Sequence, residues 1–298
     1  MLKRNFKENI ESEIFHAISN CCDKTKTECY VIGGFVRDII IGKRLVKDID
    51  ILVVGSGIDI AKLTAKKLKV KSKITVFKNF GTAMFRYNGY DIEFVGTRKE
   101  SYNKSSRNPV VSPGTLDDDL NRRDFTINAL GISLNRKSWG DFLDKFNGIT
   151  DLENKILKTP LEPRQTFSDD PLRMLRAARF SSQLNFKIDI NSFKGLIAEK
   201  ERIKIISPER ISEEINKIIM TSKPSVGFKI LESTGLLKII IPELTDLKGI
   251  EEFEGQKHKD NFFHTLEVLD NICLIYPPTH YKLCVGEVLI KTKVVLFS

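Results

Sequence analysis

Two aspartates, Asp48 and Asp50, open an apolar run that reads D-I-D-I-L-V-V. Residues two apart in a strand point to the same face, so both carboxylates are expected side by side. Such a pair suits Mg²⁺, which takes one or two protein carboxylates together with substrate phosphates. Gly33 and Gly34 come shortly before, where they let backbone N–H groups approach an anion without an intervening Cβ. This combination points to phosphoryl or nucleotidyl transfer.

The elements around these residues are short and alternate in type. The pattern predicts a strand over residues 29–32, a helix over 35–41 that ends at Gly42, and a second strand over 48–54. The glycine pair therefore stands where a strand turns into a helix, a position that favours phosphate binding. The alternative is that Asp48 and Asp50 are only surface residues at the start of a strand.

A hairpin is expected to bring further acids to the same sheet. Apolar spacing predicts a helix over residues 58–68, and strands follow over 74–77, 82–87 and 90–95. Asn88-Gly89 joins the last two strands and is a strong signal for a tight turn. The turn places Asp91 and Glu93 in the sheet that carries the aspartate pair. Either could add a third acid near the metal, or both could be solvent-facing strand residues.

The next segments are polar and then strongly patterned. Residues 97–119 have no periodicity and are predicted to be a mobile loop. Residues 120–134 read L-N-R-R-D-F-T-I-N-A-L-G-I-S-L, and a helix that carries functional side chains is expected over 122–128. The alternative is an ordinary capped helix start with its apolar residues turned inward. Arginine guanidinium groups match phosphate oxygens, and an acid or amide can recognise a sugar hydroxyl.

Residues 167–180 read F-S-D-D-P-L-R-M-L-R-A-A-R-F and predict another helix, with Ser168 as its cap. Asp170 and Arg173 are three residues apart and would share a helix face. An acceptor and a donor held in this way can bond to the Watson–Crick edge of a free base. Arg176 and Arg179 continue the same spacing and are also expected to contact the nucleotide. The alternative is an ordinary amphipathic helix.

Taken together, these motifs resemble the bacterial-type tRNA nucleotidyltransferase and poly(A) polymerase family. G-G-F-V-R-D with D-I-D and R-R-D-F-T-I-N-A-L are the specific signatures, and the resemblance covers about residues 28–270. It implies an α+β head with the nucleotidyltransferase fold, followed by an all-helical neck and body. Residues 144–152, with Asp144, Gly148 and Asp151, are similar to a hinge-like family motif. Arg210 and Glu214 resemble a further motif, for which an ion pair within a helix is expected.

The resemblance also implies residue roles. Asp48 and Asp50 would be catalytic and would hold two Mg²⁺ ions. The remaining site residues would bind the nucleotide: Gly33, Gly34 and Arg37 at the triphosphate; Arg123, Asp124 and Asn128 at the ribose and triphosphate; Asp170 and Arg173 at the base, to select CTP or ATP; and Arg176 and Arg179 beside them. The full-length polar loop argues against relatives that add only cytidines. The third acid is left open between Asp91, Glu93 and Asp124.

Composition agrees with a soluble protein that binds a polyanion. The 298 residues are 41% hydrophobic and 29% charged, with a net charge of +9. Residues 155–210 hold 12 basic against 7 acidic residues and are a candidate RNA track. The five cysteines show no paired or zinc-like spacing, and neither a signal peptide nor a membrane span is visible, so a cytoplasmic protein is expected.

Three domains are expected: a catalytic head over residues 1–150, a helical neck and body over 151–253, and the start of an HD-type domain over 254–298. His264 would be the first metal-ligand position of that domain. The adjacent His-Asp pair that completes such a site is absent, so no phosphohydrolase activity is expected.

The preferred hypothesis is a template-independent enzyme that adds or repairs the 3′-terminal CCA of tRNA from CTP and ATP. The tRNA 3′ end, CTP and ATP are its expected partners, and no membrane is involved. One rival is a poly(A) polymerase, which shares every motif. The other is a catalytically inactive RNA-binding remnant, suggested by the incomplete C-terminal pattern.

Overall fold

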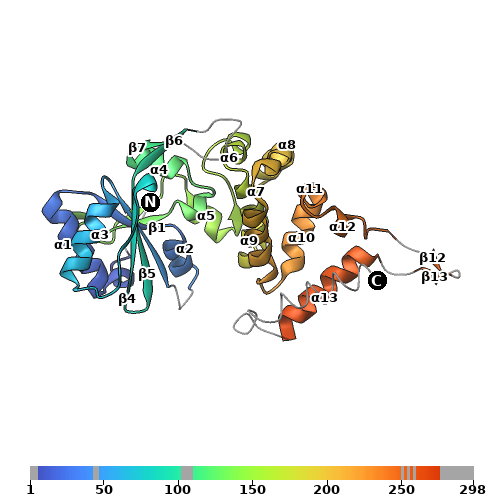
Figure 1. Cartoon of the computed structure of the whole chain (residues 1–298), viewed down its shortest axis with the longest axis horizontal. Helices are drawn as coiled ribbons and strands as arrows, with labels where there is room; N and C mark the ends of the chain where they lie inside the picture. The colour runs from blue at the N-terminus through green and yellow to red at the C-terminus, as the bar shows by residue number, and fades with distance from the viewer. Residues whose placement is uncertain are drawn as a thin grey trace. The chain divides into compact units, whose positions relative to one another are not determined.

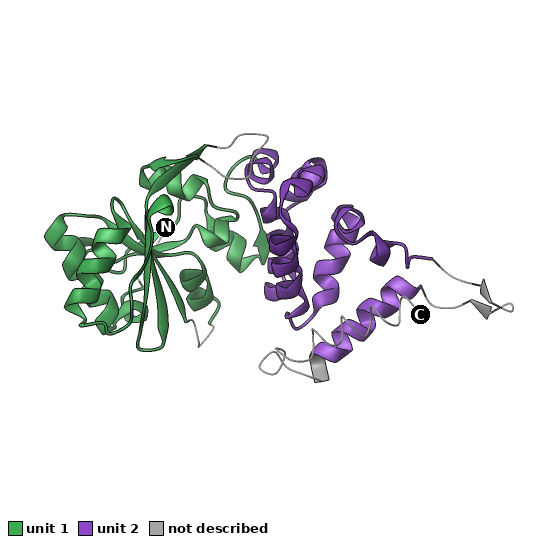
Figure 2. Ribbon diagram, in the orientation of Figure 1, with its two compact units in different colours: residues 1–162 green, residues 163–298 purple. Residues whose placement is uncertain are grey.

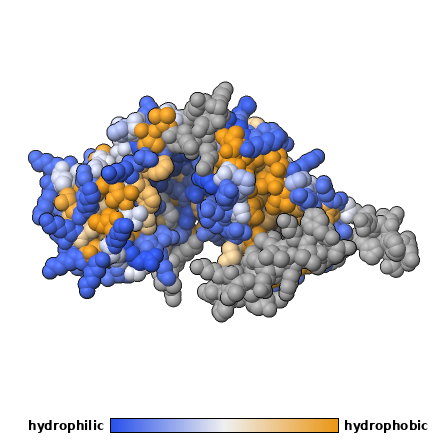
Figure 3. Space-filling model, in the orientation of Figure 1, coloured by the Kyte–Doolittle hydropathy of each residue, from blue (hydrophilic) through white to orange (hydrophobic). Residues whose placement is uncertain are grey.

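The structure, a computed structural model, describes residues 6–42, 47–101, 110–249, 252–253, 256–257 and 260–275. The chain forms two compact units, Met1–Glu162 and Pro163–Ser298, coloured separately in Figure 2 and drawn as a space-filling model in Figure 3. The sequence placed its first boundary near residue 150. The division into three domains stays a prediction.

The first unit is an α+β head. Its helices are α1 (Glu13–Thr25), α2 (Gly34–Ile40), α3 (Gly57–Lys67), α4 (Leu116–Asn121) and α5 (Gly148–Glu153), with 3-10 turns η1 (Lys7–Ile10), η2 (Lys78–Phe80), η3 (Thr126–Asn128) and η4 (Arg136–Ser138). Its strands are β1 (Cys29–Ile32), β2 (Asp48–Val53), β3 (Thr75–Phe77), β4 (Thr82–Tyr87), β5 (Tyr90–Gly96), β6 (Arg98–Ser101), β7 (Val110–Pro113), β8 (Gly131–Ser133), β9 (Phe142–Leu143) and β10 (Ile156–Leu157). The predicted α+β character of the head is confirmed.

A mixed sheet in the order β3-β4-β5-β2-β1-β8-β9 organises this unit. Strands β2 and β5 run parallel, whereas β4–β5, β1–β2 and β1–β8 are antiparallel. Figure 1 shows α1 and α3 on one side of the sheet and α4 and α5 on the other. On the α4 side, Ile32 and Leu52 pack with Leu120 and Ala129 in a fully buried cluster. Side chains alternate along β2, so Asp50 points to the same side as Leu52.

Close approach of backbones fixes α3 on the sheet. A Cβ added at Gly57 would lie 2.7 Å from the backbone nitrogen of Gly96, and one added at Gly96 would lie 2.4 Å from the Gly55 carbonyl oxygen. Only glycine fits such contacts. The helix therefore rests directly on β5, the strand that pairs with β2.

Two sequence expectations for the head are wrong. Residues 97–119 are not simply a loop: β6 pairs with β7, and Thr115 begins α4 with a capping box to Asp118. Residues 102–109 lie outside the described residues. The expected helix over residues 122–128 is not present: α4 ends at Asn121, Thr126–Asn128 form only the single turn η3, and the chain then enters β8, which pairs with β1. Pairing of β8 with β1 satisfies the backbone hydrogen-bonding groups of this segment, and this tertiary contact outweighs the helix preference of its sequence.

The second unit is predominantly helical, as expected. It comprises α6 (Pro163–Asp169), α7 (Leu172–Leu184), β11 (Lys187–Ile188), α8 (Ile190–Glu199), the 3-10 turn η5 (Lys200–Ile205), α9 (Pro208–Ile219), α10 (Pro224–Ser233), α11 (Leu236–Ile240), α12 (Pro242–Thr245), β12 (Glu252–Phe253), β13 (Gln256–Lys257) and α13 (Asn261–Ile275). The predicted helix over 167–180 is in fact two helices, because Asp170 and Pro171 separate α6 from α7. Within the described part, none of the helices has the length and hydropathy needed to cross a bilayer.

Candidate active site

Asp48 and Asp50 lie at the start of β2, and the parallel strand β5 places one acid beside each. Asp48 is opposite Asp91, and Asp50 is opposite Glu93. The predicted gathering of four acids in one sheet is therefore confirmed. Asp91 is engaged elsewhere, because both of its carboxylate oxygens accept hydrogen bonds from Arg86, at 2.7 and 3.1 Å. Glu93 is half-buried next to Asp50.

The electrostatics of this pair suit a cation. Burial raises the pKa of Glu93, and the negative charge of Asp50 raises it further, while Arg98 opposes the shift. Removal of water and a like charge both disfavour the ionised carboxylate. Among the described residues, no group of three or more acidic, histidine or cysteine side chains is close enough to form a complete metal cage. The arrangement instead fits Mg²⁺, which completes its shell with water and substrate phosphates.

A pocket of about 170 Å³ opens on the α4 side of the sheet. Its charged lining combines Asp50 and Glu93 with three arginines, Arg98, Arg122 and Arg123. A lining that combines carboxylates with guanidinium groups matches a metal-bound polyphosphate, which carries a cation and an excess of negative charge.

Gly33 gives this pocket its space. It adopts φ +79°, a backbone conformation that favours glycine. A Cβ there would lie 3.4 Å from Arg123 Nη1 and 3.6 Å from Asp50 Oδ2. The Gly33 N–H donates to the Leu130 carbonyl at 3.0 Å. Its amide is thus used within the fold, and its contribution to the site is the missing side chain.

Two hydrogen bonds from its terminal nitrogens hold Arg123 at the pocket, and its Nε is a further, buried donor. Its Nη1 donates to the Asn128 carbonyl at 3.2 Å, and its Nη2 donates to Asp119 at 3.0 Å. Its Nε is buried and has no hydrogen-bond partner among the described residues. An unsatisfied buried donor is costly, so this nitrogen favours an anionic ligand.

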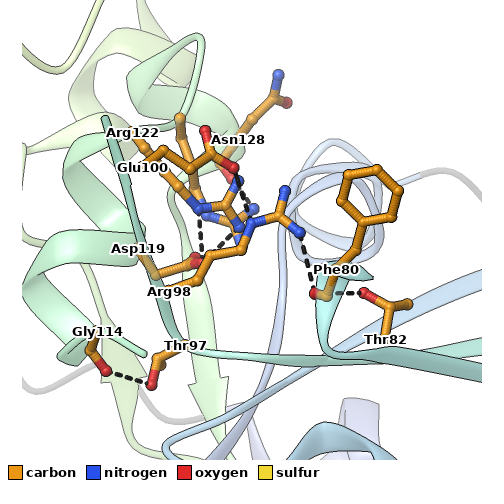
Figure 4. A network of polar contacts seen from close by, with 10 residues as sticks. Phe80, Thr82, Thr97, Arg98, Glu100, Gly114, Asp119, Arg122 and Asn128 are labelled. Carbon is orange, nitrogen blue, oxygen red and sulfur yellow. Dashed lines mark hydrogen bonds and ion pairs between the residues drawn. The ribbon is translucent and has the colours of Figure 1, made fainter. Parts of the chain in front are cut away.

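Two buried acids orient the arginines, as Figure 4 shows. Asp119, on α4, is fully buried and pairs with both Arg122 and Arg123. Glu100, on β6, accepts from Arg98 Nε at 2.8 Å and lies 3.3 Å from Arg122 Nη1. Sequence analysis missed both acids. The signal for Asp119 was available, because it stands three and four residues before two arginines on a helix.

Arg37, Asn128 and Asp124 form a second buried chain. Arg37 Nη1 donates to Asn128 Oδ1 at 2.8 Å, and Asn128 Nδ2 donates to Asp124 Oδ1 at 2.9 Å. Arg37 also donates to Asp38 at 2.8 Å. All three chain members are buried. Their side chains therefore fix the backbone of residues 124–128, on which the Arg123 contact depends.

The hinge-like motif, residues 144–152, contacts the same segment at Thr126. Asp144 accepts from the backbone amides of Gly148 and Ile149 at 2.7 and 3.0 Å, which caps α5. Asp151, on α5, accepts from Thr126 Oγ1 at 2.7 Å. A Cβ at Gly148 would lie 2.4 Å from the Thr126 carbonyl oxygen. These contacts press α5 against η3, beside Asn128.

In the second unit, Asp170 and Arg173 meet at the start of α7. Asp170 lies outside the helix, and its Oδ1 accepts from the Leu172 amide at 3.2 Å. Arg173 is buried, and its Nη1 donates to the Thr166 carbonyl at 3.1 Å. The expected shared helix face is wrong in detail, because the helix begins only at Leu172. The two residues are nevertheless joined by a backbone bond from Arg173 N to Asp170 O of 3.0 Å.

Arg176 and Arg179 differ from each other. The guanidinium carbons of both lie over the Phe180 ring, 5.2 and 4.4 Å from its centroid. Arg179 also forms an ion pair with the buried Glu214, at 3.2 Å. Glu214 bonds as well to Lys217 at 2.9 Å, so the expected pairing of Glu214 with Arg210 is replaced by these two contacts. His264 lies on α13, 4.0 Å from Glu267.

The comparisons with known proteins agree with this site. Residues 29–158 match the family model described as "Poly A polymerase head domain", and residues 185–248 match "Probable RNA and SrmB- binding site of polymerase A". The chain belongs to the bacterial-type tRNA nucleotidyltransferase and poly(A) polymerase family. It is 36% identical to an A-adding tRNA nucleotidyltransferase from Aquifex aeolicus, over 68% of this chain and 25% of that protein. It is 34% identical to a CCA-adding enzyme from Lactobacillus helveticus, over 80% of this chain and 57% of that protein.

Solved structures give the same answer for the fold. A tRNA nucleotidyltransferase complexed with a primer tRNA and an incoming ATP analogue has a TM-score of 0.64 and 29% identity, over 77% of this chain and 67% of that one. A Thermotoga maritima CCA-adding enzyme complexed with tRNA has a TM-score of 0.70 and 26% identity, over 83% and 60%. The chain spans 25% of the Aquifex aeolicus relative and 57% of the Lactobacillus helveticus relative, which is less than two thirds of either.

Proposed function

We propose that this chain is a template-independent nucleotidyltransferase that completes or repairs the 3′-terminal CCA of tRNA from CTP and ATP. The observation that carries the proposal is the pocket in which Asp50 and Glu93 face Arg98, Arg122 and Arg123. The names of the relatives support tRNA as the acceptor and CTP and ATP as donors. A cytoplasmic location is part of the proposal, because tRNA, CTP and ATP are all present in that compartment.

In the proposed reaction, the 3′-hydroxyl oxygen of the RNA forms a bond to the α-phosphorus of the nucleotide, and the bond to pyrophosphate breaks. Asp48 and Asp50 would hold Mg²⁺, with Glu93 as the third acid. When bound, the metal would favour deprotonation of the attacking hydroxyl and neutralise charge on the phosphates. Asp91 and Asp124 are assigned other roles, because Arg86 and Asn128 occupy them.

The arginines would bind the triphosphate. Arg123 contributes its unsatisfied Nε, and Arg98 and Arg122 extend the cationic wall of the pocket. Gly33 leaves room for the phosphates, and Gly34 follows at the helix start. Arg37, Asp124 and Asn128 would position the ribose-binding segment. In the second unit, Asp170 and Arg173 would read the base. We assign Arg176 to the same face and Arg179 to holding α7 against α9.

Incorporation assays test the proposal. The purified chain is incubated with Mg²⁺, labelled tRNA transcripts that end before CCA or after CC, and CTP and ATP singly and together. A three-nucleotide product that then stops is the expected result. No incorporation with Mg²⁺ present would contradict the proposal and favour the inactive remnant.

A second candidate is adenosine addition alone. It is favoured by the A-adding relative and by the poly(A) polymerase description of the head. An A-adding enzyme would add one A to the transcript that ends in CC and would add no C to the transcript that ends before CCA. A long A tail would support a poly(A) polymerase.

A further inference from the structure

The head carries a dense run of positive charge that the active site does not use. Residues 60–90 contain eight basic residues and no aspartate or glutamate, in a chain whose net charge is +9. Seven of the eight are lysines that we call the lysine patch: Lys62, Lys66, Lys67, Lys69, Lys71, Lys73 and Lys78. All seven are exposed.

The fold presents these lysines together. The sheet-facing side of α3 is formed by Gly57, Ile60, Ala61, Thr64 and Ala65, all buried, so its lysines project outward. Lys69, Lys71 and Lys73 lie on the connection from α3 to β3, the edge strand of the sheet. Lys78 begins η2, directly after that strand.

Local structure does not account for the charge. Lys66 and Lys67 stand in the last turn of α3, where cations favour the helix dipole. That reason does not extend to the lysines beyond the helix. Lys62 and Lys66 are four residues apart, a spacing at which like charges repel. Within the described residues, no ion pair involves any member of the patch. The repulsion is therefore left for a partner to offset.

Most of the patch lies on the side of the sheet opposite to the pocket (Figure 1), and Lys78, in η2, is its member nearest in sequence to a residue that lines the pocket, Thr82. Two aromatic side chains near Lys78 are exposed, Phe77 by 44% and Phe80 by 52%. The Phe80 carbonyl accepts from Arg98 Nη1 at 3.3 Å, and the Arg98 guanidinium carbon lies 6.0 Å from the Phe80 ring centroid. Arg98 and the nearby Thr82 both line the pocket. Exposed aromatic rings beside lysines suit RNA, whose bases stack while its phosphates are neutralised.

We propose that the lysine patch binds the phosphate backbone of the tRNA whose 3′ end enters the pocket. The proposal rests on the proposed function for its choice of RNA. An anionic membrane surface fits less well, because the apolar side of α3 is buried against the sheet and cannot insert into lipid. The lysine patch is in the head, separate from the basic segment of residues 155–210 that the sequence indicated as a candidate RNA track.

The test measures binding of the full chain to tRNA lacking its CCA end, without nucleotide, over a series of salt concentrations. The patch variant carries Lys62→Gln, Lys69→Gln and Lys73→Gln. The control variant carries Lys24→Gln, Lys26→Gln and Lys137→Gln, exposed lysines of the same unit outside the patch. The sets are matched: Lys62 and Lys24 are helical, and Lys69 and Lys26 both have positive φ, 52° and 55°.

The log–log salt slope of the patch variant should fall by about 2.7, since each lysine–phosphate contact contributes about 0.9, and its binding to tRNA at about 0.15 M salt should be weaker by on the order of 100-fold. The control variant should keep the slope of the unmodified chain. Equal changes in both variants, or none, would overturn the proposal, as would loss of binding to phosphatidylserine vesicles with tRNA binding intact. Thermal melting confirms that both variants fold. A chain that binds through the patch but incorporates nothing would refute the proposed function alone.

Discussion

Asp91 and Glu93 occupy equivalent places on β5, opposite Asp48 and Asp50, yet their neighbours differ. Arg86 neutralises Asp91, whereas Glu93 faces the charge of Asp50 and has a raised pKa. At the scale of single residues, these partners distinguish a structural carboxylate from one available to a cation.

Glu93→Gln should therefore lower nucleotide incorporation by about 10- to 100-fold, the usual cost of losing a group that supports a metal site. Asp91→Asn is the matched control, two residues away on the same strand, and its nucleotide incorporation should stay close to that of the unmodified chain. Steady-state incorporation at saturating tRNA checks both. A larger loss in Asp91→Asn than in Glu93→Gln would assign the third acid to Asp91.

Asp119 allows a second residue-scale prediction. Asp119→Asn removes the buried charge shared by Arg122 and Arg123, so we expect stability to fall by about 3 kcal/mol and the KM for CTP to rise about tenfold or more. Asp117→Asn is the control on the same helix, because its ion pair with Lys145 is exposed and contributes little. Thermal melting and initial rates measure the two effects. Unchanged KM with normal folding would separate Asp119 from nucleotide binding.

At the scale of elements, periodicity located the core of the head. Strands β1, β2, β4 and β5 and helices α2 and α3 lie within one residue of their predicted bounds, because their apolar residues repeat with a clear period. The ribbon of β6 and β7 was missed, since its residues are mostly polar and its stability comes from pairing and from Glu100. The segment at Phe125–Leu130 is buried on all sides, so its apolar spacing could not distinguish a helix from a turn entering a strand.

The same limit applied to the candidate site. The sequence named Asp50 and Arg123, which line the pocket in the structure, and Gly33, which lies beside both. Asp48, at the start of β2, is not among the residues that line the pocket. The sequence did not locate Asp119 or Glu100, which act through contacts between α4, β6 and the arginines. It also grouped Arg179 with the nucleotide-binding residues, although burial places Arg179 against Glu214.

The Arg179 contact is an element-scale prediction, because it joins α7 to α9. Arg179→Met should destabilise the protein by about 3 kcal/mol, since Glu214 would then lose one of its two cationic partners in a buried setting. Arg176→Met, the control one turn earlier, should cost less than about 1 kcal/mol. Urea unfolding measures both. If the two variants were equally stable, Arg179 would again be a candidate for nucleotide binding.

At the scale of the whole molecule, a head that matches the poly(A) polymerase head model is followed by a helical unit that matches an RNA-binding family model. Two of the acids at the pocket are on adjacent strands, and its arginines lie on β6 and directly after α4. A nucleotide bound there would be held by its phosphates in the head. Under the proposal above, the lysine patch outside the pocket would bind the backbone of the tRNA.

The central claim is that Asp48 and Asp50 make this pocket a nucleotidyltransferase centre. The most direct test is incorporation of CMP and AMP into tRNA lacking CCA by the unmodified chain and by the Asp48→Asn, Asp50→Asn double variant, with tRNA binding measured in parallel. We predict Mg²⁺-dependent incorporation by the unmodified chain and a loss of at least about 1,000-fold in the variant, with tRNA affinity retained. Incorporation that survives in the variant would contradict the claim.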